Sequence, residues 1–238
     1  MCGRFVSAAP PDELARYFGA TAPEGELEPN YNLAPTNEAY VVRAAAGQRA
    51  IATLTWGLVP FWSKDRKIGS RMINARSETA PEKPAFRRAY QKRRCLIPAD
   101  GFYEWAKVEG NKKKQPYFIH HRDDEPLVFG GLWEHWVPKD DDGNDQEDGR
   151  LTTCTILTTT ANETMAPVHD RMPVFIPPQR WDDWLDPESD ALELRSLLVP
   201  APSGLLQLRP VTTMVNSVRN KGPELIVEAT PEQLIGAS

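Results

Sequence analysis

Short runs of apolar and β-branched residues recur along most of the chain, separated by Gly, Pro and polar residues. Runs of this length and composition predict strands. The predicted strands cover Ala39–Val42, Ala50–Leu58, Cys95–Ile97, Phe102–Val108, Tyr117–His121, Leu127–Trp133, Leu151–Thr159 and Leu205–Thr213. Helical patterns are fewer, and they cover Pro11–Phe18, Lys83–Gln91, Pro178–Leu185 and Asp190–Leu198. The pattern predicts an α+β fold with one large, mostly antiparallel sheet system and short helices.

Length and composition favour one globular domain. The 238 residues exceed the usual size of one domain by about half, and 40% of them are hydrophobic against 26% charged, which excludes collagen-like and wholly disordered chains. No apolar stretch approaches the length of a membrane span, and the first residues lack the pattern of a signal peptide. The three cysteines match neither a disulfide framework nor a metal-binding pair, so we expect reduced thiols, no metal and a cytoplasmic location.

Charge is distributed unevenly along the chain. The net charge is −5, but residues 139–150 alone hold six acids and two bases, which is typical of a solvated loop. Residues 62–94 hold eleven bases and three acids, a local charge of +8. A basic segment of this kind is compatible with a polyanion partner, and equally with an ordinary solvated surface.

Cys2 is the first residue that could carry unusual chemistry. Removal of Met1 would leave a cysteine with both a free α-amine and a thiol. An α-amine is partly neutral at pH 7 and a thiol is a strong nucleophile, so the pair can trap an aldehyde: the amine forms a Schiff base and the thiol closes a five-membered thiazolidine. The alternative is an ordinary terminal cysteine.

Two further residues could transfer protons. Glu104 lies among aromatic residues in a predicted strand, where it could shuttle protons if it points inward and would be an ordinary surface residue if it points outward. His169 has an acid and an arginine as close neighbours, although a surface or capping histidine is the commoner outcome. No set of His and Cys has metal-ligand spacing.

The basic segment also contains an amide and aromatic side chains. Asn74 could orient a nucleophile without adding charge, or it could cap a helix, and Arg76 could bind a phosphate. Aromatic residues in and around this segment, Trp62 and Trp105 included, suit stacked nucleobases, but they could equally belong to the core.

Six motifs in order resemble one known family. They are Met1-Cys2-Gly3-Arg4-Phe5, Tyr31-Asn32-Leu33-Ala34-Pro35, Trp56-Gly57-Leu58-Val59-Pro60, Ile73-Asn74-Ala75-Arg76-Ser77-Glu78, Pro98-Ala99-Asp100-Gly101-Phe102-Tyr103-Glu104-Trp105 and His169-Asp170-Arg171-Met172-Pro173. Together they resemble the SOS response-associated peptidase (SRAP) family from residue 2 to about residue 222. The resemblance implies a single domain over residues 1–238 with a mostly antiparallel, barrel-like core, in which the acidic loop 139–150 is an insertion.

The resemblance also implies a function. Members of this family sense abasic sites in single-stranded DNA, cross-link to them covalently, and lose Met1 autocatalytically. We therefore expect a thiazolidine cross-link through Cys2 that shields the lesion, with a peptidase or hydrolase activity toward Met1 and a lyase-like activity toward the abasic site. No cofactor is implied, and a monomer is expected, cytoplasmic and associated with the nucleoid when bound to DNA.

The family's functional residues match positions of this chain. By resemblance the catalytic cysteine, asparagine, glutamate and histidine are Cys2, Asn74, Glu104 and His169. In these roles Asn74 would hold the terminal amine, Glu104 would shuttle protons, and His169 would assist proton transfer. The expected DNA contacts are Arg4, Pro35, Trp62, Arg71, Arg76, Trp105 and Arg171. The acidic loop is expected at an edge away from the DNA.

Two other functions remain open from the sequence. Cys2 could belong to a peptidase that acts on other proteins, with its α-amine as general base. The chain could also be a non-catalytic module that binds single-stranded DNA. Binding to DNA should weaken steeply with salt, which peptide hydrolysis need not do.

Overall fold

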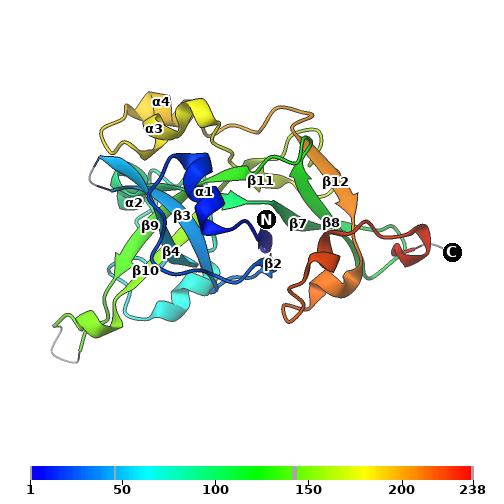
Figure 1. The fold of residues 1–238 in the computed structure, drawn as a ribbon, viewed down its shortest axis with the longest axis horizontal. Helices are drawn as coiled ribbons and strands as arrows, with labels where there is room; N and C mark the ends of the chain where they lie inside the picture. The colour runs from blue at the N-terminus through cyan, green and yellow to red at the C-terminus, as the bar shows by residue number, and fades with distance from the viewer. Residues whose placement is uncertain (1, 46, 141–143, 237–238) are drawn as a thin grey trace.

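The computed structural model describes residues 2–45, 47–140 and 144–236, which form an α+β fold of two sheets (Figure 1). The five-stranded sheet has the order β12-β8-β7-β1-β2. Its strands are β1 (Phe5–Ser7), β2 (Asn30–Leu33), β7 (Gly101–Lys107), β8 (Lys114–His121) and β12 (Leu206–Pro210). All pairings within this sheet are antiparallel.

The seven-stranded sheet closes on itself. Its strands are β3 (Glu38–Ala45), β4 (Gln48–Trp56), β5 (Asn74–Arg76), β6 (Arg94–Ala99), β9 (Leu127–Trp136), β10 (Leu151–Thr160) and β11 (Arg171–Pro173). β9 pairs with both β6 and β10, which completes a ring of β4, β3, β6, β9 and β10. Only the pairings of β10 with β4 and β5 are parallel. The predicted α+β class and mostly antiparallel, barrel-like core are therefore confirmed.

Helices cover the outer face of the seven-stranded sheet. The α-helices are α1 (Pro11–Phe18), α2 (Arg87–Lys92), α3 (Trp181–Leu185) and α4 (Ala191–Ser196). Short 3-10 helices are η1 (Arg66–Arg71), η2 (Glu147–Gly149), η3 (Pro178–Arg180), η4 (Thr213–Asn216), η5 (Pro223–Ile226) and η6 (Pro231–Gln233). Leu14 and Phe18 of α1 pack with Tyr40 and Val42 of β3 in one core. The buried side chains of α1 thus pack against alternate residues of β3.

A second core lies between the two sheets. In β3, Ala39 and Val41 alternate with the residues that face the helices, and they pack here with Phe5 of β1 and Phe102 of β7. Both faces of β3 are buried, which explains why this strand reads as a nearly continuous apolar run. The two sheets share this core and form a single unit.

Most predicted elements are present, and the differences lie at their ends and in the shortest strands. The strand predicted over Leu205–Thr213 ends at Pro210, which has no N–H to donate to a sheet, and the chain turns into η4. The helix predicted from Lys83 begins at Arg87, and the helix predicted over Pro178–Leu185 begins with the 3-10 turn η3. The strands β1, β2, β5 and β11 were not predicted.

The described residues of the acidic loop, between β9 and β10, lie at one end of the molecule, away from the N-terminus (Figure 1). They form internal ion pairs, from Lys139 to Asp145 at 3.5 Å and from Arg150 to Glu147 at 2.7 Å. Residues 141–143 lie outside the described residues. The assignment of residues 1–238 to one SRAP-like domain, with 139–150 as an insertion, stays a prediction. No helix in the described ranges has the length and apolarity that crossing a membrane requires.

The backbone of Gly57 contacts that of Gly69 and thereby places η1 against the end of β4. Gly57 has a φ of +128°, and a Cβ atom at this position would lie 2.6 Å from the Gly69 carbonyl oxygen. We expect Gly57→Ala to lower the free energy of unfolding by about 2 to 4 kcal/mol, because it combines backbone strain with a backbone clash. Urea denaturation measures this change.

Gly110→Ala is the matched control. Gly110 also has a positive φ, +72°, but a Cβ atom there would meet nothing within 4 Å. Gly110→Ala should therefore lower the free energy of unfolding by only about 1 kcal/mol. Equal losses for the two variants would contradict the proposed clash.

Candidate functional site

Cys2 is buried at the point where the two sheets meet. Its side chain is 1% exposed and belongs to the core between the sheets. The residues that follow it form β1, which pairs with β2 and β7, and Phe5 packs edge-on against Trp56 at 5.0 Å between ring centroids. The thiol donates a weak hydrogen bond to the Arg4 carbonyl at 3.8 Å. Strand pairing of β1 therefore fixes the position of Cys2.

The surroundings of Cys2 keep its thiol protonated. Burial raises the pKa of the thiol well above its usual range, and the negative charge of Glu104 raises it further. Burial likewise raises the pKa of Cys154 to about 12. Cys2, Cys95 and Cys154 are all free thiols. At neutral pH a neutral thiol, rather than a thiolate, is present at Cys2.

Asn74 contacts Cys2 directly. It lies in β5, where it pairs in parallel with Ile156 of β10, and its Nδ2 atom donates a hydrogen bond to the Cys2 carbonyl oxygen at 2.8 Å. Its Oδ1 atom is buried and has no hydrogen-bond partner within the described part of the chain. A buried amide oxygen of this kind can accept a hydrogen bond from a group that becomes available beside it.

Glu104 points into the core between the sheets. Along β7, Phe102 belongs to that core and Tyr103 to the core on the opposite face, so alternation directs Glu104 toward the Cys2 side. Glu104 is 5% exposed, and its charge acts on the Cys2 thiol. The inward orientation, one of the two left open by the sequence, is the one observed.

His169 lies in the turn between β10 and β11. Met165, in the same turn, is buried in the core that contains Cys2. The Nδ1 atom of His169 accepts a hydrogen bond from the Arg171 N–H at 3.0 Å and also lies 2.9 Å from Asp170 Oδ1. Because Asp170 is 86% exposed and its ion pair is screened by water, we assign Nδ1 as the acceptor of the backbone N–H. In the neutral ring the proton then resides on Nε2.

Arg171 is already paired within the protein. It is 8% exposed, and its guanidinium donates to both carboxylate oxygens of Glu78, at 2.5 and 2.8 Å, and to the Thr158 carbonyl at 2.6 Å. These contacts tie the turn that carries His169 to the segment after β5. The DNA contact expected at Arg171 stays a prediction.

Arg4 and Trp105 lie together, and each is close in sequence to a candidate residue, Arg4 to Cys2 and Trp105 to Glu104. The Arg4 guanidinium lies 5.9 Å from the centre of the Trp105 ring, and its Nη1 atom donates to Asn32 Oδ1 at 2.8 Å and to the Val215 carbonyl at 3.0 Å. Trp105 Nε1 donates to Asn216 Oδ1 at 2.7 Å. Both residues therefore contact the C-terminal part of the chain.

The other expected DNA contacts lie at or near the surface. Arg76 is exposed two residues after Asn74, on the same side of β5. Trp62 is 50% exposed, and Arg71 is exposed at the end of η1. Pro35 is half-buried in the turn between β2 and β3. These positions are accessible to a ligand, and their contacts with DNA stay predictions.

Sequence reasoning missed the part played by Asn32 and Asn216. Asn32 is 1% exposed and bonded to Arg4, and Asn216 is the partner of Trp105. Asn32 stands in a motif that supports the family resemblance, but a buried amide with partners about 180 residues away gives no local signal.

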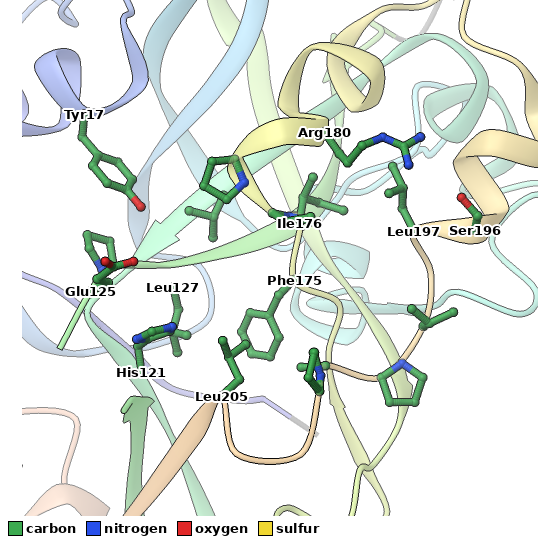
Figure 2. A pocket seen from close by; sticks show the side chains of 18 residues that line it. Tyr17, His121, Glu125, Leu127, Phe175, Ile176, Arg180, Ser196, Leu197 and Leu205 are labelled. Atoms are coloured by element: carbon green, nitrogen blue, oxygen red, sulfur yellow. The ribbon is translucent and has the colours of Figure 1, made fainter. Parts of the chain in front are cut away.

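No metal or apolar ligand site coincides with these residues. Among residues 2–45, 47–140 and 144–236 no group of three or more His, Cys, Asp or Glu could hold a metal ion. An apolar cavity of about 400 Å³, lined by Tyr17, Leu127, Phe175 and Leu205 among others, contains none of the candidate residues (Figure 2). Cys2, Asn74 and Glu104 form the chemically distinctive site.

Comparisons with known proteins agree on one family. Residues 1–218 match the family model described as SOS response associated peptidase (SRAP). The chain is 41% identical over 229 residues to abasic site processing protein YoqW of Bacillus subtilis, across 95% of this chain and 99% of YoqW. It is 33% identical over 236 residues to abasic site processing protein HMCES of Gallus gallus, across 86% of this chain and 67% of HMCES.

Solved structures share the fold. A protein from Bacteroides thetaiotaomicron superposes with a TM-score of 0.82 at 23% identity, across 96% of this chain and all of that one. A protein from Bordetella bronchiseptica superposes with a TM-score of 0.73 at 28% identity, across 89% and 100% of the two chains.

The pair of Glu78 and Arg171 predicts a pH dependence of stability. The hydrogen bond from Arg171 holds the pKa of Glu78 below its ordinary value of 4.5. The pair's stabilisation is therefore full above pH 4.5 and is lost as the pH falls through the lower pKa of the folded state. We expect Glu78→Gln to lower the free energy of unfolding by less than about 1 kcal/mol at pH 7, because the carboxylate is half-exposed. Urea denaturation at several pH values should show this difference shrinking in acid, and a constant difference would contradict it.

Proposed function

The chain belongs to the SOS response-associated peptidase family, and on this premise we propose that it captures abasic sites in single-stranded DNA through a covalent bond to Cys2. The observation that carries the proposal is the placement of Cys2. Its carbonyl accepts a hydrogen bond from Asn74, and the charge of Glu104 raises the pKa of its thiol. The relatives YoqW and HMCES are named abasic site processing proteins.

The first step we propose is the removal of Met1. Water hydrolyses the Met1–Cys2 peptide bond, which releases methionine and leaves Cys2 with a free α-amine. Met1 itself lies outside the described residues. The Cys2 carbonyl stays bound to Asn74 Nδ2, so Cys2 keeps its place while its nitrogen becomes an amine. This step is the basis for classing the activity as a hydrolase or peptidase.

The cross-link then forms in two bond-making steps. The α-amine adds to the aldehyde carbon of the ring-opened abasic deoxyribose, and loss of one water gives a Schiff base. The Cys2 sulfur adds to the same carbon, and the thiol proton passes to the nitrogen. The product is a thiazolidine, and the net change is the loss of one water.

Asn74 and Glu104 suit distinct parts of this sequence. The buried Oδ1 atom of Asn74 can accept an N–H of the new amine, which leaves the nitrogen lone pair available for attack. Glu104 can protonate the ring oxygen of the sugar as it opens, and can later take the thiol proton. A buried neutral thiol needs such a base when it attacks.

His169 and the positively charged surface complete the proposal. His169 Nε2 can exchange a proton with the leaving water or with the adduct during reversal. Arg76 and the other bases of residues 62–94 provide positive charge for the phosphates of a single strand. Aromatic residues Trp62 and Trp105 offer flat apolar faces where bases could stack.

We further propose a monomer that works in the cytoplasm and is associated with the nucleoid when bound to DNA. The three free, buried cysteines suit a reducing compartment. The described residues of the acidic loop lie at the end of the molecule away from the N-terminus, so their charge would not repel DNA at Cys2 (Figure 1).

Intact mass measurement tests the proposed function. The purified protein should lack Met1, and incubation with an oligonucleotide that carries one abasic site should add the mass of the oligonucleotide minus one water. In Cys2→Ala the α-amine remains but the ring cannot close, so we expect only a heat-labile adduct that borohydride stabilises. Cys154→Ala should cross-link like the wild type, because Cys154 lies within β10 and has no free α-amine.

Two results would point to the other functions. Loss of Met1 without any DNA adduct would favour a peptidase that acts on other proteins. Salt-sensitive DNA binding that is identical in the wild type and Cys2→Ala, again without an adduct, would favour a non-catalytic binding module.

Asn74→Ala tests the positioning of the amine. Loss of the hydrogen bond to the Cys2 carbonyl and of the Oδ1 acceptor should slow cross-linking at saturating DNA by about tenfold or more. Affinity for an oligonucleotide with a tetrahydrofuran, which cannot open to an aldehyde, should not change. Asn144→Ala, in the exposed acidic loop, is the control. Weaker tetrahydrofuran binding with an unchanged rate would instead make Asn74 a DNA contact.

A further inference from the structure

The segment that follows β12, residues 213–221, has no part in the chemistry above. It begins with η4 and is referred to below as the C-terminal wall. Its Asn216 Oδ1 accepts the Trp105 Nε1–H at 2.7 Å, and its Val215 carbonyl accepts from Arg4 at 3.0 Å. Arg4 and Trp105 are close neighbours of Cys2 and Glu104 in sequence. The wall therefore contacts two residues that are expected to bind DNA and that lie within two positions of Cys2 and Glu104 in the sequence.

A single buried amide fixes the backbone of the wall. Asn32 of β2 is 1% exposed, and its Nδ2 atom lies 3.1, 3.0 and 3.0 Å from the carbonyl oxygens of Val215, Ser217 and Asn220. Its Oδ1 atom accepts from Arg4. Carbonyls gathered on one side chain hold this irregular segment in one conformation, which keeps its side chains in place before any ligand binds.

The side chains that the wall presents to solvent are of two kinds. Met214 and Val218 are each 47% exposed, which is unusual for two apolar residues four positions apart. Arg219 and Lys221 are exposed cations. Residues 194–223 contain four bases and no acid, although the whole chain is acidic. Cations beside exposed apolar groups are what a single nucleic-acid strand requires, for its phosphates and for its bases.

We propose that the C-terminal wall binds the stretch of single strand next to the abasic nucleotide. Arg219 and Lys221 pair with its phosphates, and Met214 and Val218 pack against the flanking base. Asn32 is a positioning residue that holds the wall. The proposal rests on the proposed function for the identity of the lesion, but binding of the strand does not require the covalent step.

The experiment compares two double variants of the full chain. Arg219→Gln with Lys221→Gln removes the two cations of the wall. Arg16→Gln with Lys139→Gln removes two exposed cations, one on α1 and one on the acidic loop. Binding to single-stranded tetrahydrofuran DNA is measured by fluorescence anisotropy at several salt concentrations, and the cross-linking rate is measured at saturating aldehyde DNA.

We expect the wall variant to bind about tenfold more weakly at low salt, with a salt slope smaller by about 1 to 1.5, as two lost phosphate contacts predict. Its cross-linking rate at saturating DNA should equal that of the wild type. The control should match the wild type in every measurement. Unchanged affinity and salt slope in the wall variant would overturn the proposal.

Asn32→Leu separates positioning from charge. It retains the approximate size of the side chain and every cation of the wall, adds no charge, and removes the N–H donors. We expect weaker tetrahydrofuran-DNA binding together with faster hydrogen exchange confined to residues 213–221, and wild-type exchange there with wild-type affinity would refute the role of Asn32. If the wild type binds DNA through the wall but never cross-links, the proposed function fails while this inference stands.

Discussion

The whole site depends on the burial of the short strand β1 between β2 and β7. Phe5 is 1% exposed and packs edge-on against both Trp56 and Phe129, and burial of such a ring contributes about 2 to 3 kcal/mol. Because Cys2 lies three residues before Phe5, this packing places the start of the chain in the interior instead of leaving it to fray. The α-amine that Met1 removal would create is therefore held in a defined position.

Burial of Cys2 also sets the kind of chemistry that the site can perform. A thiol whose pKa is raised by burial and by a neighbouring carboxylate is a poor nucleophile toward an ordinary peptide or ester. An adjacent amine changes this, because a Schiff base on the same residue is a much stronger electrophile and lies within ring-closing distance of the sulfur. Burial, together with the charge of Glu104, keeps the thiol protonated before the reaction, and in the proposed sequence Glu104 takes the proton when the sulfur attacks. The surroundings of Cys2 thus favour an aldehyde over a peptide as the target.

The sequence predicted the long elements and missed the short ones that carry the site. All eight predicted strands are present because each is long enough to show an apolar run, whereas β1, β5 and β11 have three residues each and show no periodicity. Yet β1 follows Cys2, β5 contains Asn74, and β11 begins two residues after His169. Only the resemblance to a family singled out these residues together. The pairing of Arg171 with Glu78, and the contacts of Asn32 with residues 215–220, depend on segments far apart in sequence, which no local pattern reveals.

The covalent structure at the sugar is the central claim, and carbon NMR of an oligonucleotide labelled with ¹³C at C1′ of its abasic site tests it most directly. The account predicts that, in the wild-type complex, the labelled carbon becomes a saturated centre bonded to both nitrogen and sulfur, and that no such signal forms with Cys2→Ala. A labelled carbon that stays in the hemiacetal form, or that remains an imine in the wild type, would contradict ring closure by Cys2.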